Sequence, residues 1–537
     1  MTPSKRIVFL AMDAGDKNLI TEWAADGTLT TMHSLLSRGL VGNTASVDGF
    51  YEGSTWPCLY TGTNPARHGF HHLTQIRPGT YEFYRCNPGE FIKREPFWNY
   101  LSRAEKKVAI LDVPLSGISE GLLGIQMVEW GSHDAVYGFQ AWPPGLKAEV
   151  TSRFGNHPLG TCCDAEGRSP EDFCRFRDQL IEGVNKKCEL TLHYLKQDDW
   201  DFFAQVFTEG HCAGHQCWHL HDPAHPNYDP GTVSLTGDPI REVYVAIDRA
   251  IGKILAEVDE DTLVVFLATH RMSYSMGKDF MLGQILEKLN VVQRLPEGMF
   301  PRVFHAATGG WNRLPDPVRA LLKPALYPLY HLSGRTGSGE DSNRLSSRMD
   351  LEKCRCFPHG NGGLVSGIRV NLSGREPTGV IKPGAEYDDF CRQLTEDLLD
   401  VTDSASGQPM VKRVMKTSDL FQGEYLDHLP DLLVEWNEEI RMGSKAVKDD
   451  ASCRVQAVSD KIGLVEGEYG YCRTGDHRPE GLFVVLGPGI QPGTVVRTVS
   501  IMDLAPTFLH WFGLACDDLD GQPIAEISGS RMASDAP

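Results

Sequence analysis

The stretch IVFLAMD, residues Ile7–Asp13, is the segment on which the fold assignment depends. Six apolar residues in a row that end at an acidic one are too few for a signal-peptide core or a membrane span, and they predict a buried strand. In parallel sheets, ligand-binding side chains gather just beyond the carboxyl ends of the strands. Asp13 therefore lies where a functional carboxylate is expected.

Further apolar runs resemble this one and alternate with helical patterns along the chain. Strands that alternate with helices indicate an α/β fold with a mostly parallel central sheet flanked by helices. The predicted strands are Ile7–Met12, Val108–Val113, Phe202–Phe207, Leu263–Ala268, Leu432–Glu435 and Leu482–Leu486, and the predicted helices are Leu19–Arg38, Glu171–Leu195, Glu242–Val258 and Tyr387–Val401.

Two stretches interrupt the alternation. Residues 70–100 are rich in aromatic residues, Arg and Pro, and residues 278–356 carry Pro, Gly and Ser clusters around helical pieces such as Pro317–Tyr327. We interpret both as cap insertions over the sheet edge, within one domain that spans residues 1–537. Ordinary surface decoration would give the same composition.

The composition narrows the class of protein. The chain has 537 residues and a formal net charge of −19, which disfavours a nucleic-acid scaffold. An anionic substrate would need local positive charge, such as metal ions. Without an export signal or a segment long enough to span a membrane, we expect a soluble cytoplasmic protein with no membrane partner and with reduced cysteines.

Ligand-type side chains follow several of the predicted strands. One such residue alone would mean little, but four separate elements that deliver Asp and His to one sheet edge indicate a metal site. Asp13 follows the first strand, Glu209 and His211 follow Phe202–Phe207, His270 follows Leu263–Ala268, and Asp476 and His477 precede the last strand.

His211 and His215 are four residues apart, so on a helix both imidazoles face the same way and can share an ion. Catalytic zinc usually has three protein ligands and an open position, and His477 would complete that set. For His68, His219 and His221 we favour ordinary hydrogen-bonded roles.

The segment Gly53–Pro57 precedes a predicted helix and contains Ser54 and Thr55. A hydroxyl residue at such a place is commonly a helix cap. The same place suits an oxygen nucleophile, because free backbone amides and the helix dipole favour an anion. The two interpretations are balanced on the residues alone.

Several stretches resemble one family, the alkaline phosphatase superfamily and specifically its type I phosphodiesterase/nucleotide pyrophosphatase branch. The resemblance covers both ends and the middle of the chain. It is carried by Ala11–Ala14 with LITEWAADGTLTTMHSLLSRG, by TGTNPARHG (61–69), GGLVSGIRVNLSGREPTGVIKPG (362–384), TGDHRPEGLFVVLGPGI (474–490) and VSIMDLAPTFLHWFGL (499–514).

The resemblance implies the alkaline phosphatase-like fold and two adjacent divalent ions, typically zinc. By position, Asp13 matches an early Asp ligand of one ion, and His270 matches the His of an Asp-His pair at the same ion. His215 and His477 match two ligands of the other ion.

Three positions depart from the family pattern. His211 and Thr269 both stand where the family has Asp. An ungapped count back from the TG motif at 61–62 reaches Glu52 at the nucleophile position, whereas a short shift gives Ser54 or Thr55. We prefer Thr55, because it precedes Trp56-Pro57.

Two carboxylates are thus exchanged for neutral ligands, which weakens the compensation of repulsion between two ions. A single ion bound by His211, His215 and His477 is therefore an alternative to the two-ion arrangement. In that case a metal-bound hydroxide rather than Thr55 could attack.

The function that we predict is metal-dependent hydrolysis of a small-molecule phosphate ester, most simply a phosphodiester or nucleotide pyrophosphate. A phosphotransferase or phosphomutase and a sulfate-ester hydrolase are alternatives on the same fold. A non-catalytic metal-binding homologue is a further one. The substrate itself and the oligomeric state are not readable from the sequence.

Overall fold

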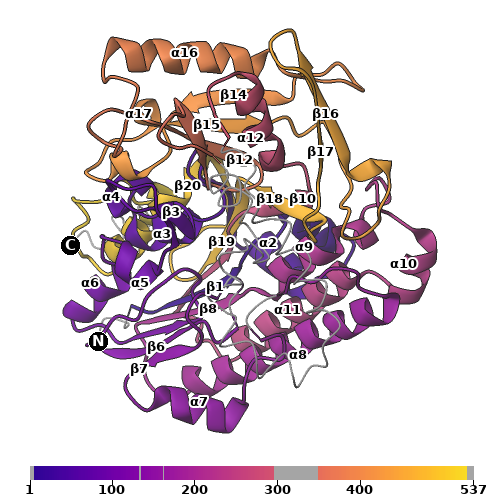
Figure 1. Cartoon of the computed structure of the whole chain (residues 1–537). Helices are drawn as coiled ribbons and strands as arrows, with labels where there is room; N and C mark the ends of the chain where they lie inside the picture. Colours follow the sequence, from indigo (N-terminus) through magenta and orange to yellow (C-terminus); the bar gives the residue numbers. More distant parts are fainter. Residues whose placement is uncertain (1–4, 132, 134, 161–162, 295–348, 529–537) are drawn as a thin grey trace, which may run out of the picture.

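The computed structural model describes residues 5–131, 133, 135–160, 163–294 and 349–528. Its largest sheet within these residues has nine strands, and Figure 1 shows it across the lower half of the molecule. The strand order is β20 (Gly493–Ser500), β2 (Leu40–Ala45), β19 (Glu480–Leu486), β9 (Leu263–Ala268), β1 (Ile7–Met12), β8 (Phe202–Phe207), β5 (Val108–Leu111), β6 (Gly124–Val128) and β7 (Gln140–Trp142).

Most of the sheet is parallel. β1 pairs in parallel with both β8 and β9, and β5 does so with β6 and β8. Among the nine strands, β19 and β7 run against the others. The predicted fold class, a mostly parallel α/β sheet flanked by helices, is therefore confirmed.

Each face of the sheet is covered by its own helices, because alternate residues of a central strand point to opposite faces. Val8, Leu10 and Met12 of β1 enter one core, and Ile7, Phe9 and Ala11 enter the other. The first core contains α1 (Lys17–Ala25), α2 (Thr30–Arg38), α8 (Pro170–Leu195), α9 (Glu209–His221) and α11 (Pro239–Leu255), and the second contains α3 (Thr55–Thr61), α6 (Phe97–Arg103) and α18 (Leu504–Trp511).

Smaller antiparallel sheets form the upper half of the molecule in Figure 1, beneath α16 (Ala385–Leu399). One has the order β11 (Cys356–His359), β12 (Val365–Val370), β15 (Leu432–Trp436) and β14 (Val411–Lys416), and another pairs β16 (Arg454–Ser459) with β17 (Gly463–Glu468). A two-stranded ribbon of β10 (Arg271–Tyr274) and β18 (Gly475–Arg478) lies against α9.

The predicted elements are confirmed in most cases and wrong in two respects. The helix predicted over Leu19–Arg38 is two helices, since Gly27 adopts a φ of 83° and separates α1 from α2. The strand at Leu432 belongs to the smaller antiparallel sheet rather than to the central one. The predicted helical piece Pro317–Tyr327 lies outside the described residues, as does most of the insertion at 278–356.

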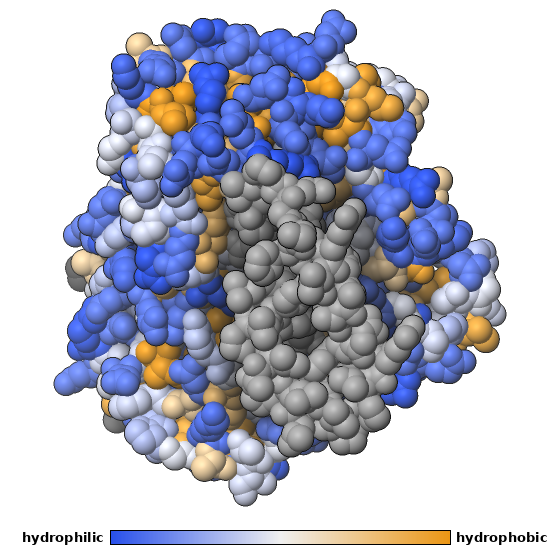
Figure 2. All heavy atoms as spheres, in the orientation of Figure 1, coloured by the Kyte–Doolittle hydropathy of each residue, from blue (hydrophilic) through white to orange (hydrophobic). Residues whose placement is uncertain are grey.

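The visible surface is mainly hydrophilic. In Figure 2 blue residues predominate on the face shown, and orange ones form small separate groups. Within the described ranges, no helix combines the length and the apolar character that crossing a membrane requires. Every cysteine that the structure describes is a free thiol.

Candidate metal centre

Five of the predicted site residues meet at the carboxyl edge of the central sheet. Asp13 comes directly after β1, and His211 and His215 lie on the first turns of α9, which follows β8. His270 lies between β9 and β10, and His477 lies on β18. β9, β1 and β8 are neighbours in the sheet, so their ends bring these side chains together.

Hydrogen bonds connect the members of this cluster. His211 Nδ1 lies 2.6 Å from Asp13 Oδ2, and His211 Nε2 lies 2.9 Å from His215 Nε2. His215 Nδ1 donates to the Gly475 carbonyl oxygen at 2.8 Å, which leaves a lone pair on His215 Nε2. Two ring nitrogens that face each other at this distance are held by a shared proton or by a cation.

His477 closes the group from the ribbon. Its ring centroid lies 4.7 Å from those of both His211 and His215 and 4.5 Å from that of His270. His270 in turn lies 6.2 Å from His211, and Thr269, which precedes it, accepts a hydrogen bond from the Ala14 amide. Thr269, which stands where the family has Asp, therefore links the end of β9 to the residue after Asp13 through this hydrogen bond.

Burial lowers the pKa of three imidazoles in the cluster, those of His215, His270 and His477, which favours their neutral form. Burial lowers the pKa of His270 to about 4, and burial together with neighbouring cationic groups lowers the pKa of His215 and of His477 well below the ordinary value. Burial alone would raise the pKa of Asp13, but the adjacent His211 holds it below its usual range. Three imidazoles in the neutral form together with an ionised carboxylate are the kind of donors that zinc prefers.

Unsatisfied polar atoms provide a direct test of whether a divalent ion fits. Within the described part of the chain, both ring nitrogens of His270 and Nδ1 of His477 are buried without a hydrogen-bond partner. Buried polar groups are otherwise nearly always paired. Lone pairs that are left unpaired beside Asp13 are what metal ligands present, so this donor set fits a cation.

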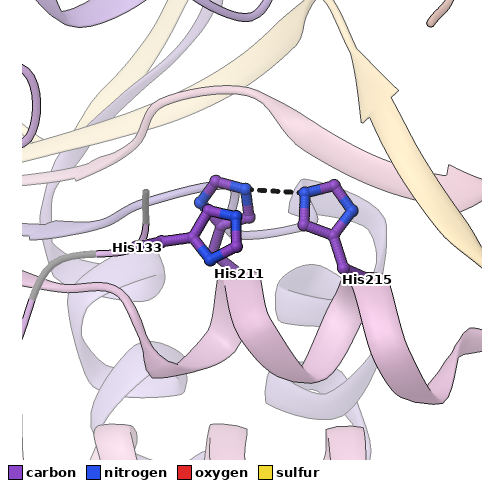
Figure 3. A group of neighbouring side chains, drawn as sticks. All are labelled: His133, His211 and His215. Carbon is purple, nitrogen blue, oxygen red and sulfur yellow. Dashed lines mark hydrogen bonds between the residues drawn. The ribbon is translucent and has the colours of Figure 1, made fainter. Parts of the chain in front are cut away.

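Two further residues, His133 and Arg473, complete the surroundings of the cluster. His133 lies in the loop after β6, and Figure 3 shows its ring beside those of His211 and His215. The donor nitrogens of these three rings all lie within 4.8 Å of one another. Arg473 donates to His215 Nε2 at 3.0 Å and to His133 Nε2 at 3.2 Å. Asp164 anchors the same guanidinium through two contacts of 3.0 Å.

Neither His133 nor Arg473 was predicted as a site residue from the sequence. His133 lies five residues beyond the end of β6, which is a neighbour of β5 at the same sheet edge. That position was the one signal in the sequence that could have found it.

The nucleophile candidates Glu52, Ser54 and Thr55 form hydrogen bonds with residues outside the histidine cluster. The Thr55 hydroxyl is buried, donates to the Tyr51 carbonyl at 2.9 Å and lies 3.1 Å from the Ser46 hydroxyl. Its neighbour Trp56 reaches the centre, where the indole N–H donates to Asp13 Oδ1 at 2.7 Å.

Glu52 and Ser54 take other partners. Glu52 Oε1 accepts the Gly363 amide at 2.9 Å, and burial and the Asp476 carboxylate raise the pKa of Glu52 to about 8. Ser54 Oγ donates to the Phe70 carbonyl at 2.9 Å. His219 bonds to Thr474 and His221 to Asp238, so both histidines have ordinary hydrogen-bonded partners.

Comparisons with known proteins identify the family and support the fold. The sequence model of the type I phosphodiesterase/nucleotide pyrophosphatase family matches residues 7–457. Phosphonoacetate hydrolase from Sinorhizobium meliloti 1021, in complex with phosphonoformate, is similar over 96% of this chain and 96% of its own, with 12% identity and a TM-score of 0.50. Murine ectonucleotide pyrophosphatase/phosphodiesterase 5 is similar over 96% and 98% of the two chains, with 11% identity and a TM-score of 0.45. No curated protein sequence matches the chain.

Proposed function

Because this chain belongs to the type I phosphodiesterase/nucleotide pyrophosphatase family and is therefore a phosphoester hydrolase, we propose that it cleaves phosphodiester or nucleotide pyrophosphate bonds of small molecules with a divalent metal. The observation that carries this proposal is the convergence of Asp13 with imidazoles from three other elements of the fold. Zinc is the proposed metal, since imidazole nitrogen dominates the donor set.

In this proposal His211, His215 and His477 hold the principal ion, and Asp13 with His270 holds a weaker second one. A bound divalent ion polarises the phosphoryl oxygens and offsets the negative charge that develops during transfer. The short contacts among the first three imidazoles and the unpaired nitrogens of His270 support this division.

The residues around the ligands have positioning roles. The Gly475 carbonyl fixes the tautomer of His215, and the Trp56 indole orients Asp13. Arg473, anchored on Asp164, adds positive charge beside the ligands in a chain whose net charge is −19. Such a charge favours an anionic phosphate at the same edge.

Metal analysis combined with activity assays tests the proposal. Purified protein should contain zinc and should hydrolyse bis-p-nitrophenyl phosphate faster than the monoester or the sulfate ester. His215→Ala and His477→Ala should lose metal and lower kcat/KM at least about 100-fold, because each removes a ligand. His193→Ala, on the outer helix α8, is the matched control and should retain both.

Other results would contradict the proposal. Preference for the sulfate ester would show that the protein is a sulfate-ester hydrolase. Transfer of the phosphoryl group to an acceptor without phosphate release would show that it is a phosphotransferase. Full activity of the metal-free protein would exclude the metal role.

Thr55 is the proposed attacking hydroxyl. It adjoins Trp56, which touches Asp13, although attack requires its hydroxyl to leave the Tyr51 carbonyl. Thr55→Ala should then reduce turnover by orders of magnitude at unchanged metal content, and Thr55→Ser should restore part of it. If Thr55→Ala stays active and Glu52→Gln does not, the carboxylate at the ungapped position is the essential group instead.

A further inference from the structure

A second group of metal-ligand side chains lies directly beside the candidate metal centre. His133 Nδ1 is 3.2 Å from Cys163 Sγ and 3.3 Å from Cys212 Sγ, and the three ligand atoms all lie within 4.8 Å of one another. All three side chains are buried. We propose that His133, Cys163 and Cys212 bind a thiophilic metal ion of the Zn²⁺ class, in a site separate from that of Asp13 and its histidines.

The spacing of the donor atoms matches such an ion. Zinc bonds of about 2.3 Å to sulfur and about 2.0 Å to nitrogen, at tetrahedral angles, separate the nitrogen and sulfur atoms by roughly 3.5 Å. The observed separations of 3.2 and 3.3 Å are close to this value, so an ion requires only a slight outward movement of the thiols. Two thiolates and one imidazole also form a known catalytic zinc set with an open fourth position.

A cavity supplies the fourth position. A space of about 10 Å³ is lined by His133, Cys163 and Cys212 together with His157 and Glu209. This volume approaches what one water molecule needs. Glu209 is one of the lining residues, and its Oε2 atom is buried and lacks a hydrogen-bond partner among the residues that the structure describes. A water on the ion would donate to that oxygen and satisfy it.

The surrounding charges suit a cation with anionic ligands. Binding of the ion releases the two thiol protons to solvent, and the resulting thiolates neutralise its charge. The Glu209 carboxylate is compensated separately by Lys187 and His157. Lys187 Nζ lies 3.4 Å from Glu209 Oε1 and 3.2 Å from Asp112, and His157 Nε2 lies 3.0 Å from Glu209 Oε1. No additional counter-charge is needed to bury the ion.

The two sites share structural elements. Cys212 follows His211 on α9, and Cys163 precedes Asp164, which anchors Arg473. Because Arg473 donates to His133 Nε2, the ring proton of His133 lies on Nδ1, facing the sulfurs. An ion on Nδ1 displaces that proton. The proton then moves to His133 Nε2, so this nitrogen no longer accepts a hydrogen bond from Arg473. The Arg473 guanidinium keeps its hydrogen bonds to Asp164.

Cobalt substitution tests the proposal, because thiolate ligands give Co²⁺ an intense charge-transfer absorption in the near ultraviolet that Asp and His ligands do not. The full-length protein is stripped with a chelator under reducing conditions and titrated with Co²⁺. We expect the thiolate absorption in the wild type, its loss in Cys163→Ser and Cys212→Ser, and its retention in Cys188→Ser, which alters a buried cysteine of α8.

The double variant His215→Ala/His477→Ala separates this inference from the proposed function. It should lose hydrolysis and keep the thiolate absorption. If the wild-type protein loaded with Co²⁺ lacks that absorption, the inference is wrong, regardless of the results with the variants. Absorption that persists in both serine variants, or a disulfide between Cys163 and Cys212 in the reduced preparation, overturns it as well.

Discussion

At the scale of single residues, Trp56 offers the simplest test of how the centre is held. Its indole N–H donates to Asp13 Oδ1, and both side chains are buried. Trp56→Phe keeps an aromatic ring in place but removes the donor. Outer partners of metal ligands typically contribute 10–100-fold in affinity or activity, so we expect about a tenfold or larger loss of zinc affinity. Competitive chelator titration measures it.

Trp98→Phe is the matched control for this prediction. Trp98 is equally buried in the same core, but its indole donates to Ser119 rather than to a proposed metal ligand. The control should lose some stability, visible in the thermal midpoint, at unchanged zinc affinity. Equal zinc affinity of Trp56→Phe and the wild type would show that Asp13 does not depend on this bond.

Strand ends made the histidine positions predictable from sequence, whereas loop residues were harder to place. Asp13, His211 and His270 could be assigned to one edge because buried apolar runs fix where a parallel strand stops. His133, in an irregular loop, has no such periodic reference. Glu52, Ser54 and Thr55 stayed ambiguous because a shift of two or three residues decides which side chain faces the centre, and their roles remain predictions.

At the scale of elements, the contact between α9 and the β10–β18 ribbon sets the distance between His215 and His477. A Cβ atom on Gly475 would lie 2.1 Å from the Gly214 carbonyl oxygen, so only glycine allows the ribbon to approach this closely. Gly475→Ala should push the ribbon away, break the His215–Gly475 hydrogen bond and lower zinc affinity by about tenfold or more. Overpacking of this kind costs about 1–3 kcal/mol of stability.

Gly470→Ala is the control, since a Cβ atom there meets no other atom within 4 Å. It should match the wild type in zinc affinity and in thermal midpoint. If Gly475→Ala lowers the midpoint but binds zinc as tightly as the wild type, the ribbon is not needed to position His477.

Element boundaries followed local chemistry where that chemistry was strong. The predicted bounds of β1, β8 and β9 agree with the structure, because each is a largely apolar run bounded by polar residues. The division of Leu19–Arg38 was missed although Asp26-Gly27 is a turn signal, since the apolar periodicity continues through it. Whether β15 joins the central sheet is decided by pairing across the whole chain, which local patterns do not encode.

At the scale of the whole molecule, the chain buries many neutral histidines besides those of the centre. Burial lowers the pKa of His68, His219 and His359 to about 3 and that of His225 to about 4, against an ordinary value of 6.5. The unfolded chain therefore binds more protons than the folded one between pH 6.5 and these values. The free energy of unfolding therefore decreases as the pH falls from 6.5 towards these lowered pKa values.

Each such histidine contributes up to about 1.4 kcal/mol per pH unit to the slope, and urea unfolding in EDTA between pH 7.5 and 4.5 measures the sum without metal effects. His68→Asn should make the loss in acid less steep. His221 has the opposite sign, because Asp238 outweighs burial and raises the pKa of His221, so His221→Asn should make the loss steeper. Equal slopes in all three proteins would mean that these imidazoles gain protons in the folded state as readily as in the unfolded chain.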